Sequence, residues 1–320
     1  MIFCDPPDHT RLRNIVNRSF TPRMIADLEP RIRQVTDDLI GGVQHKGEMD
    51  LMADLAIPLP VTIIAEILGV DPARKEDFKR WSDGAVGDVA QATAPTGYDA
   101  EGDDEDGMAF QAYFENVVAE RRRDPQDDMI SHLIRAEEEQ QALDSDEVLA
   151  FIGLLLIAGN ETTTNLLGNA MIALLDHPDQ LQKVLDDPSL VPNLVEEALR
   201  YDAPVQFLFR RATQDVEIAG TLIPQGSMVM VVFGSANRDE RKYPDSEKFD
   251  VTRDTQGHLA FGHGIHFCLG APLARLEAKI ALAALLKLDN LARADEGRVE
   301  LIDSFFLRGP KRLPLTFTLS

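Results

Sequence analysis

Cysteine is nearly absent from this chain of 320 residues, where only Cys4 and Cys268 occur. Two cysteines cannot build the disulfide framework of a secreted scaffold in so long a chain, so a reducing cytoplasm is expected. No basic and apolar secretory leader is visible at the start of the sequence. The longest apolar run, residues 148–159, is shorter than the roughly 20 residues that cross a bilayer, so no membrane span is predicted.

Basic residues are also scarce. Lysine and arginine number 32 against 54 acidic residues, which gives a formal charge of -22. A nucleic-acid-binding protein needs a basic stripe that displaces counterions, so this composition excludes that class and disfavours docking on anionic membranes. The chain is 44% hydrophobic and 27% charged, as expected of a globular protein with a large core.

The spacing of apolar residues and of prolines predicts a mainly α fold with a small β portion. Residues 8 to about 90 are expected to form helices broken by prolines, namely Pro22, Pro30, Pro58, Pro60 and Pro72. A long helix is expected from a cap at Asp144, with Glu147 completing a capping box, to about residue 175.

A shorter helix should begin near Pro192 and end before Pro204, and another should cover residues 271–286. Between them, residues 216–223 and 228–233 are expected to be short strands joined by a turn at residues 224–226. Strands and turns should close the chain between residues 301 and 319.

Residues 90–107 differ in composition from their surroundings, because they combine proline and glycines with an acidic run at residues 103–106. This pattern predicts a solvated loop. An exposed connector and a lid over a substrate both fit it.

The most informative segment is Phe261-Gly-His-Gly-Ile-His-Phe-Cys268-Leu-Gly270. Its three glycines predict a tight turn with positive φ values. Cys268 should lie where the next helix begins, and free N–H groups at a helix start stabilise a thiolate and lower its pKa. A thiolate held in such a loop is a suitable axial ligand for haem iron.

Other chemistry fits the same residues. Zinc would use His263, His266 and Cys268, although a closed structural site usually has four ligands with more cysteine. Cys268 would also fit a catalytic nucleophile or a small buried core residue. Spacing alone leaves all of these interpretations open.

The whole string, however, resembles the haem-binding loop of the cytochrome P450 family, with Phe261, Gly262, Gly264, Cys268 and Gly270 in the family's pattern. The resemblance implies a cytochrome P450 fold and a monooxygenase that activates dioxygen. It implies haem b as cofactor, with its iron ligated by Cys268. It further implies a single haem-binding domain over residues 1–320 that lacks the family's usual N-terminal helices and strands.

Residues Ala158-Gly159-Asn160-Glu161-Thr162 resemble the family's oxygen-activation segment in its long central helix. Glycine removes side-chain bulk beside a ligand. The Thr162 hydroxyl can turn to a carbonyl one turn back and open the helix locally. Glu161 and Thr162 are an acid–alcohol pair suited to proton delivery. Without the cysteine loop, a polar patch on a buried helix would explain the same residues.

Glu197 and Arg200 resemble the family's buried Glu–Arg pair, which supports the cysteine loop from behind. An i,i+3 pair of this kind is otherwise common on helix surfaces. The family adds an arginine from the segment before the loop. Here Lys248 takes a position where many members have arginine, so Arg253 is the candidate for the third member.

His9 and Arg13, one helical turn apart, resemble the family's clamp on the haem propionates. Arg210 and His266 are the matching cations later in the chain, and the neighbouring Arg211 is an alternative to Arg210.

The expected substrate is apolar and small, a lipid, terpenoid, steroid or polyketide. Core packing would explain each of the candidate pocket residues equally well, namely Leu155, Val205, Phe207, Leu208 and Phe305.

No G-x-G-x-x-G fingerprint for a flavin or nicotinamide is present. The resemblance therefore implies electrons from a ferredoxin-type donor with its reductase. Basic residues on the cysteine side that would steer an acidic donor are Arg11, Arg18, Arg275 and Lys279.

Three other functions compete with this one. The first is a haem-binding protein with little or no monooxygenase activity, and the second is an enzyme that uses peroxide directly. The third is a helical binding module without metal, which would give the glycine-rich cysteine loop no purpose.

Overall fold

The computed structural model describes residues 1–74, 77–78, 80–81, 105–136, 145–295 and 297–318. The described part is mainly helical with three small antiparallel sheets, so the predicted fold class is confirmed. Most of the expected loop at residues 90–107 and the expected cap Asp144 lie outside the described residues; residues 105–107 already belong to a helix.

The N-terminal helices follow one another with short connections. Their bounds are α1 Asp8–Ser19, α2 Pro22–Asp27, α3 Glu29–Gln44, the π-helical turn Met52–Ala56, α4 Pro58–Ile67 and a 3₁₀ turn at Pro72–Arg74. Three of the prolines predicted to break helices do mark helix boundaries, where they lie in first turns: Pro22 opens α2, Pro30 is the second residue of α3, and Pro58 opens α4. Proline fits there because first-turn N–H groups have no partner inside the helix.

The remaining helices include the longest one. Their bounds are α6 Glu105–Arg123, α7 Met129–Ala136, α8 Ser145–Asp176, α9 Pro178–Asp186, α10 Val191–Tyr201, α11 Phe233–Ala236 and α12 Ala271–Leu285, with 3₁₀ turns at Pro188–Leu190 and Gly264–His266. The predictions for α8, α10 and α12 are confirmed to within one or two residues. Glu147, however, pairs with Arg11 of α1, which joins the start of α8 to that helix.

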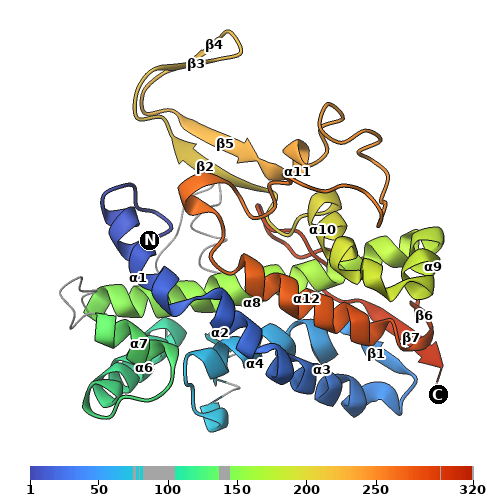
Figure 1. The fold of residues 1–320 in the computed structure, drawn as a ribbon, viewed down its shortest axis with the longest axis horizontal. Helices are drawn as coiled ribbons and strands as arrows, with labels where there is room; N and C mark the ends of the chain where they lie inside the picture. Colours follow the sequence, from blue (N-terminus) through green and yellow to red (C-terminus); the bar gives the residue numbers. More distant parts are fainter. Residues whose placement is uncertain (75–76, 79, 82–104, 137–144, 296, 319–320) are drawn as a thin grey trace.

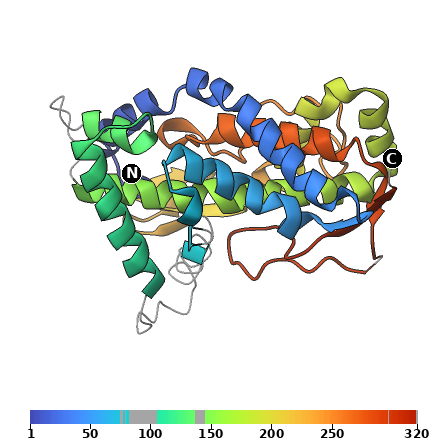
Figure 2. The same cartoon turned by 90° about the horizontal axis from the view of Figure 1, so that it is seen from below.

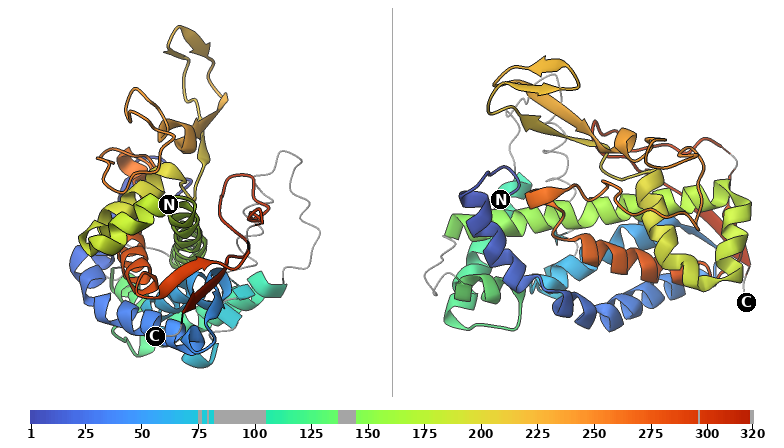
Figure 3. Two further views of the ribbon diagram at one scale, coloured as in Figure 1. Left: turned by 90° about the vertical axis from the view of Figure 1, so that its right-hand side faces the viewer. Right: turned by 45° about the horizontal axis from the view of Figure 1, so that its top comes forward.

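Each sheet is small and antiparallel. One has the order β1-β7-β6, from β1 Glu48–Asp50, β7 Pro314–Thr318 and β6 Asp289–Arg293. The second pairs β2 Phe207–Arg211 with β5 Met228–Val232, and the third pairs β3 Val216–Ile218 with β4 Thr221–Ile223. The last two stand away from the helical body in Figures 1 and 3.

The prediction of one strand over residues 216–223 is wrong. The chain turns back at Ala219 and Gly220, whose φ values are 51° and 78°, so Ile218 pairs with Thr221. Positive φ at both central residues is the geometry of a two-residue hairpin turn. The predicted strand 228–233 is present, but it pairs with residues 207–211, which were not predicted as a strand.

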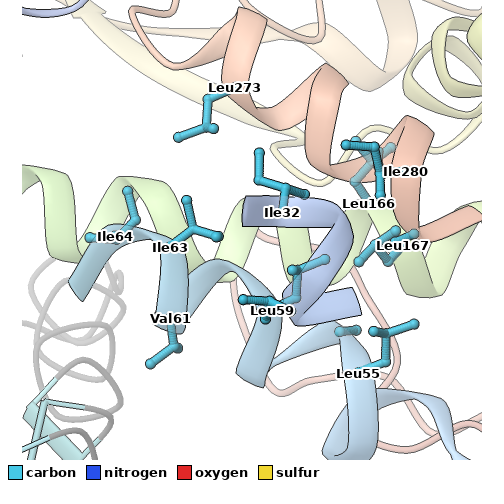
Figure 4. Packing of buried hydrophobic residues seen from close by; sticks show 14 of the residues in the cluster. Ile32, Leu55, Leu59, Val61, Ile63, Ile64, Leu166, Leu167, Leu273 and Ile280 are labelled. Atoms are coloured by element: carbon cyan, nitrogen blue, oxygen red, sulfur yellow. The ribbon is translucent and has the colours of Figure 1, made fainter. Parts of the chain in front are cut away.

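Helix α8 crosses the whole molecule and forms the centre of the core (Figures 1 and 2). It packs against α4, α10 and α12, while α12 also contacts α3. Figure 4 shows Ile32 of α3, Leu59 of α4 and Leu167 of α8 close together in this core, and all three are fully buried. Each such side chain stabilises the fold by about 1.5–3 kcal/mol relative to exposure. This packing fixes the relative positions of α8 and α12, which carry much of the candidate site.

No helix in the described ranges combines the length and the apolar character that a membrane crossing needs.

Candidate functional site

The cysteine loop adopts the backbone that its glycines predicted, with one exception. Gly262 and Gly264 have φ values of +71° and +74°, and the Cys268 N–H donates to the Phe261 carbonyl at 2.9 Å. Gly270 instead caps α12 with φ -80°, so the prediction of positive φ at all three glycines is wrong there. Since any residue can adopt that conformation, Gly270 is not required for the turn.

Cys268 lies just before α12, as predicted, and its sulfur accepts hydrogen bonds from the N–H groups of Gly270 and Ala271. Burial nevertheless raises the pKa of the free thiol, and this effect outweighs the two N–H groups and the charges of Arg13 and Arg275. The prediction of a lowered pKa is therefore wrong for the thiol alone. A buried sulfur of this kind becomes a thiolate when a cation is bound to it.

A cavity separates the cysteine loop from α8. Its walls come from α1, α4, α8, Leu208 and Arg210 of β2, the cysteine loop and α12, with one residue each from α10 and α11. Cys268 lines this cavity, whereas Cys4 does not. The predicted site residues that line it are His9, Arg13, Leu155, Ala158, Gly159, Thr162, Val205, Leu208, Arg210, Phe261, Gly262, His266, Cys268 and Gly270.

Three residues predicted for the catalytic pair or the substrate pocket, Phe207, Phe305 and Glu161, do not line the cavity. Phe207 is buried, and its ring lies 5.0 Å from the ring of Phe305 and 5.6 Å from that of Phe209, centroid to centroid. These rings pack on one another beside the β2–β5 sheet. Glu161 follows Asn160 in α8 and is partly buried without reaching the cavity wall.

On the α8 side, the Thr162 hydroxyl donates to the Ala158 carbonyl at 2.8 Å, as predicted. The helix continues through this point from Ser145 to Asp176, so the expected local opening is not seen. Gly159 has a second role that the sequence did not reveal: a Cβ at this position would lie 2.8 Å from the Ile64 Cδ1 atom of α4. The glycine thus permits the close contact of α4 with α8.

Four cationic or imidazole side chains meet at one end of the cavity: His9, Arg13, Arg210 and His266. The two imidazole rings lie 4.3 Å apart, centroid to centroid. Burial lowers the pKa of both histidines, and nearby arginines lower it further. Arg211 is not at the cavity wall and donates to the Gly226 carbonyl.

His9 is 2% exposed, and within the described part of the chain neither ring nitrogen has a hydrogen-bond partner. Buried polar atoms normally have partners, so these two nitrogens call for one. An anionic group with several acceptor oxygens, such as a pair of carboxylates, would pair with all four side chains.

Behind the loop, Glu197 and Arg200 form a fully buried ion pair with two hydrogen bonds of 2.7 and 2.8 Å. Arg253 Nε lies 3.4 Å from Glu197, so the structure brings all three predicted members together. Arg200 and Arg253 also donate to the Lys248 carbonyl. The cluster therefore holds the segment before the cysteine loop.

Sequence reasoning missed Glu277, a charged residue at the cavity wall. Glu277 of α12 is 1% exposed, accepts a hydrogen bond from Thr163 of α8, and has its pKa raised to about 8 by burial. A glutamate on an amphipathic helix, here between Leu276 and Ala278, is usually exposed. Only its place at the seventh residue of α12, on the same face as Leu273, gave a hint of burial.

The structure also bears on the zinc alternative and on the cations proposed to contact a redox partner. Across the ranges that the structure describes, no three His, Cys, Asp or Glu residues gather as metal ligands, which speaks against zinc. Of the four cations proposed for a redox partner, Arg11 pairs with Glu147 and Arg275 pairs with Glu196.

These features fit a haem-thiolate protein. The cavity has a cysteine sulfur in an amide-lined loop on one side and a hydroxyl of a long helix on the other, and the cations at one end of it suit carboxylates. The family model described as "Cytochrome P450" matches residues 105–317. "Cytochrome P450 107B1" of Saccharopolyspora erythraea is 43% identical over 98% of this chain and 76% of its own length. "Vitamin D(3) 25-hydroxylase" of Pseudonocardia autotrophica is 42% identical, covering 99% of this chain and 77% of its own.

A solved structure, cytochrome P450 CYP109Q5 from Chondromyces apiculatus, superposes with a TM-score of 0.91 at 48% identity, covering 99% of this chain and 78% of that one. The chain belongs to the cytochrome P450 family. It is a haem-thiolate monooxygenase, an oxidoreductase whose cofactor is haem b bound through a cysteine thiolate.

Proposed function

We propose that this monooxygenase hydroxylates an apolar small molecule of the lipid, terpenoid, steroid or polyketide class. The observation that carries the proposal is the apolar wall around Cys268, formed by Leu154, Leu155 and Leu166 of α8 with Val205 and Leu208. Binding of an apolar ligand against such a wall is favourable, because it removes apolar surface from water. The relative named vitamin D(3) 25-hydroxylase supports a substrate of this kind.

Cys268 is the proposed iron ligand, with its sulfur held by the Gly270 and Ala271 N–H groups. His9, Arg13, Arg210 and His266 would bind the haem carboxylates. When bound, the haem supplies the activation of dioxygen. A single haem-binding domain over residues 1–320, in the cytoplasm, is part of the same proposal.

Thr162 lies at the cavity wall, and Glu161 precedes it in α8. We assign them the delivery of protons into the cavity, with the Thr162 hydroxyl as the last protein group. Its hydrogen bond to the Ala158 carbonyl leaves the oxygen lone pairs able to accept from a water on the cavity side. The hydroxyl would thus hold the water that passes the proton on, and loss of the hydroxyl would release that water.

Electrons are proposed to come from a ferredoxin-type donor with its reductase. The candidate contacts are Arg11, Arg18, Arg275 and Lys279; of these, Arg11 pairs with Glu147 and Arg275 pairs with Glu196. A haem-binding protein without activity is not favoured, because Cys268 and Thr162 both line the cavity.

The ligand is tested by reducing the purified protein, adding carbon monoxide and recording the Soret band. Thiolate ligation gives a strongly red-shifted band, which Cys268→Ala should abolish and Cys4→Ala, at the other cysteine, should preserve. A red-shifted band in Cys268→Ala would refute the assignment.

The substrate class is tested by titrating the ferric protein with a steroid, a macrolide and a fatty acid. Displacement of water from the cavity should shift the Soret band for at least one of them, and Leu155→Glu should weaken that response more than Phe305→Glu. Leu155 lines the cavity and Phe305 does not. No shift with any of the three probes would contradict the proposed class.

A further inference from the structure

Glu196 lies next to Glu197 in α10 but makes a separate set of contacts. One of its oxygens accepts from Nε of Arg275 at 2.6 Å, and the other accepts from Nη2 of Arg275 at 2.9 Å. The second oxygen also lies 2.9 Å from Nε2 of His258. A single carboxylate thus joins the segment before Cys268 to the helix after it.

His258 fixes the backbone that leads into the cysteine loop. Its side chain is 5% exposed, and its Nδ1 atom accepts the Ala260 N–H at 3.2 Å. Because Nδ1 is the acceptor, Nε2 carries the proton and donates to Glu196. The imidazole therefore bridges α10 and the backbone at Ala260.

Arg275 reaches the same stretch from α12. While paired with Glu196, its guanidinium lies over the Phe261 ring, 4.5 Å from the ring centroid. A guanidinium over an aromatic face is attractive and favours one ring position. The Phe261 carbonyl in turn accepts the Cys268 N–H at 2.9 Å, so the chain of contacts ends at the cysteine.

We propose that Glu196, Arg275 and His258 form a positioning network that fixes Phe261 and thereby holds the Cys268 sulfur toward the cavity. The two neighbouring glutamates of α10 contact different partners. Glu197 binds Arg200, Arg253 and the Asp250 N–H, which lie before the loop. Glu196 acts on the loop itself. The inference rests on Cys268 as the iron ligand, as proposed above.

The test is amide hydrogen exchange of the haem-loaded protein in Arg275→Gln and Glu196→Gln. Loss of the bidentate pair should raise exchange in residues 258–270 by about tenfold or more, because local opening there becomes easier. The matched control is Arg31→Gln. Arg31 forms an equally bidentate pair with Glu66 and is 41% exposed, against 35% for Arg275, but it joins α3 to α4.

A second readout is the ligation state. After mild heating, the reduced carbon monoxide complex of Arg275→Gln should lose its red-shifted thiolate band several times faster than that of Arg31→Gln. Arg275→Lys keeps the charge but not the planar fork or the stacking, so it should behave like Arg275→Gln. If Arg275→Gln does not fold, Arg275→Lys and Glu196→Gln carry the test.

Exchange in residues 258–270 that stays at the control level in these variants would overturn the network, and so would equal band loss in Arg275→Gln and Arg31→Gln. The exchange readout does not depend on which residue binds iron. A wrong ligand assignment would instead show as a red-shifted band that survives in Cys268→Ala.

Discussion

Glu277 on α12 is hydrogen-bonded to Thr163 on α8, one residue beyond Thr162, in the wall of the haem cavity. Within the described residues its other carboxyl oxygen, Oε1, has no hydrogen-bond partner. A carboxyl group buried this way is stable in its neutral form, because ionisation without a nearby cation is costly. Sequence position gave no sign of this contact, which exists only because α12 packs on α8.

Ionisation of Glu277 should lower the free energy of unfolding as the pH rises. Burial raises its pKa from 4.5 to about 8, so its contribution is complete below pH 4.5 and is lost between pH 4.5 and 8. Each pKa unit corresponds to about 1.4 kcal/mol, so the total is several kcal/mol. Glu277→Gln should flatten the pH dependence of the urea unfolding free energy over this window. Equal slopes in the two proteins would contradict the burial argument.

Gly159→Ala should destabilise the protein by about 1–3 kcal/mol through overpacking. The new Cβ would lie 2.8 Å from Ile64 Cδ1 and 2.9 Å from Cγ1. Ile64→Ala removes both atoms, so Gly159→Ala should cost much less in that background. A double-mutant cycle of urea unfolding measures the coupling. Additive effects would show that α4 and α8 do not touch at Gly159.

Arg200→Ala should cost roughly 3–5 kcal/mol, because it leaves Glu197 buried without its main partner. Both side chains are fully buried. Arg253→Ala should cost less, since its contact with Glu197 is longer, at 3.4 Å. Chemical unfolding of the two variants gives the comparison, and a larger loss in Arg253→Ala would reverse the assigned order.

His9→Ala and Arg13→Ala should each speed haem transfer to a scavenging apoprotein by about tenfold, if each removes one charge-assisted contact to a carboxylate. Arg211→Ala is the control, because Arg211 lies beside Arg210 but away from the cavity wall. Equal transfer rates in His9→Ala and Arg211→Ala would remove His9 from the proposed clamp.

Thr162→Val should leave the carbon monoxide band red-shifted but raise the number of electrons consumed per product molecule. Valine keeps the shape at this position and lacks the hydroxyl that accepts from the cavity side. The measurement compares reductant consumption with product yield. Unchanged coupling would show that the Thr162 hydroxyl is not needed for proton delivery.

Several features of the site could be predicted from sequence because local chemistry fixes them. Positive φ at Gly262 and Gly264 depends on the absence of Cβ, and the Thr162 back-bond joins residues four apart in one helix. The start of α12 just after Cys268 follows from the same short stretch. Recognition of the family then connected distant motifs such as His9 and His266, which the structure brings within 4.3 Å.

Tertiary packing alone decided the rest. Three contacts join residues far apart in sequence. They are the contact of Gly159 with Ile64, the burial of Glu277 against Thr163, and the bridge from Glu196 to Arg275. The raised pKa of the Cys268 thiol likewise reflects burial by the whole fold, which outweighs the helix start. Periodicity reports which face of a helix is apolar, but it carries no information on which neighbour will cover that face.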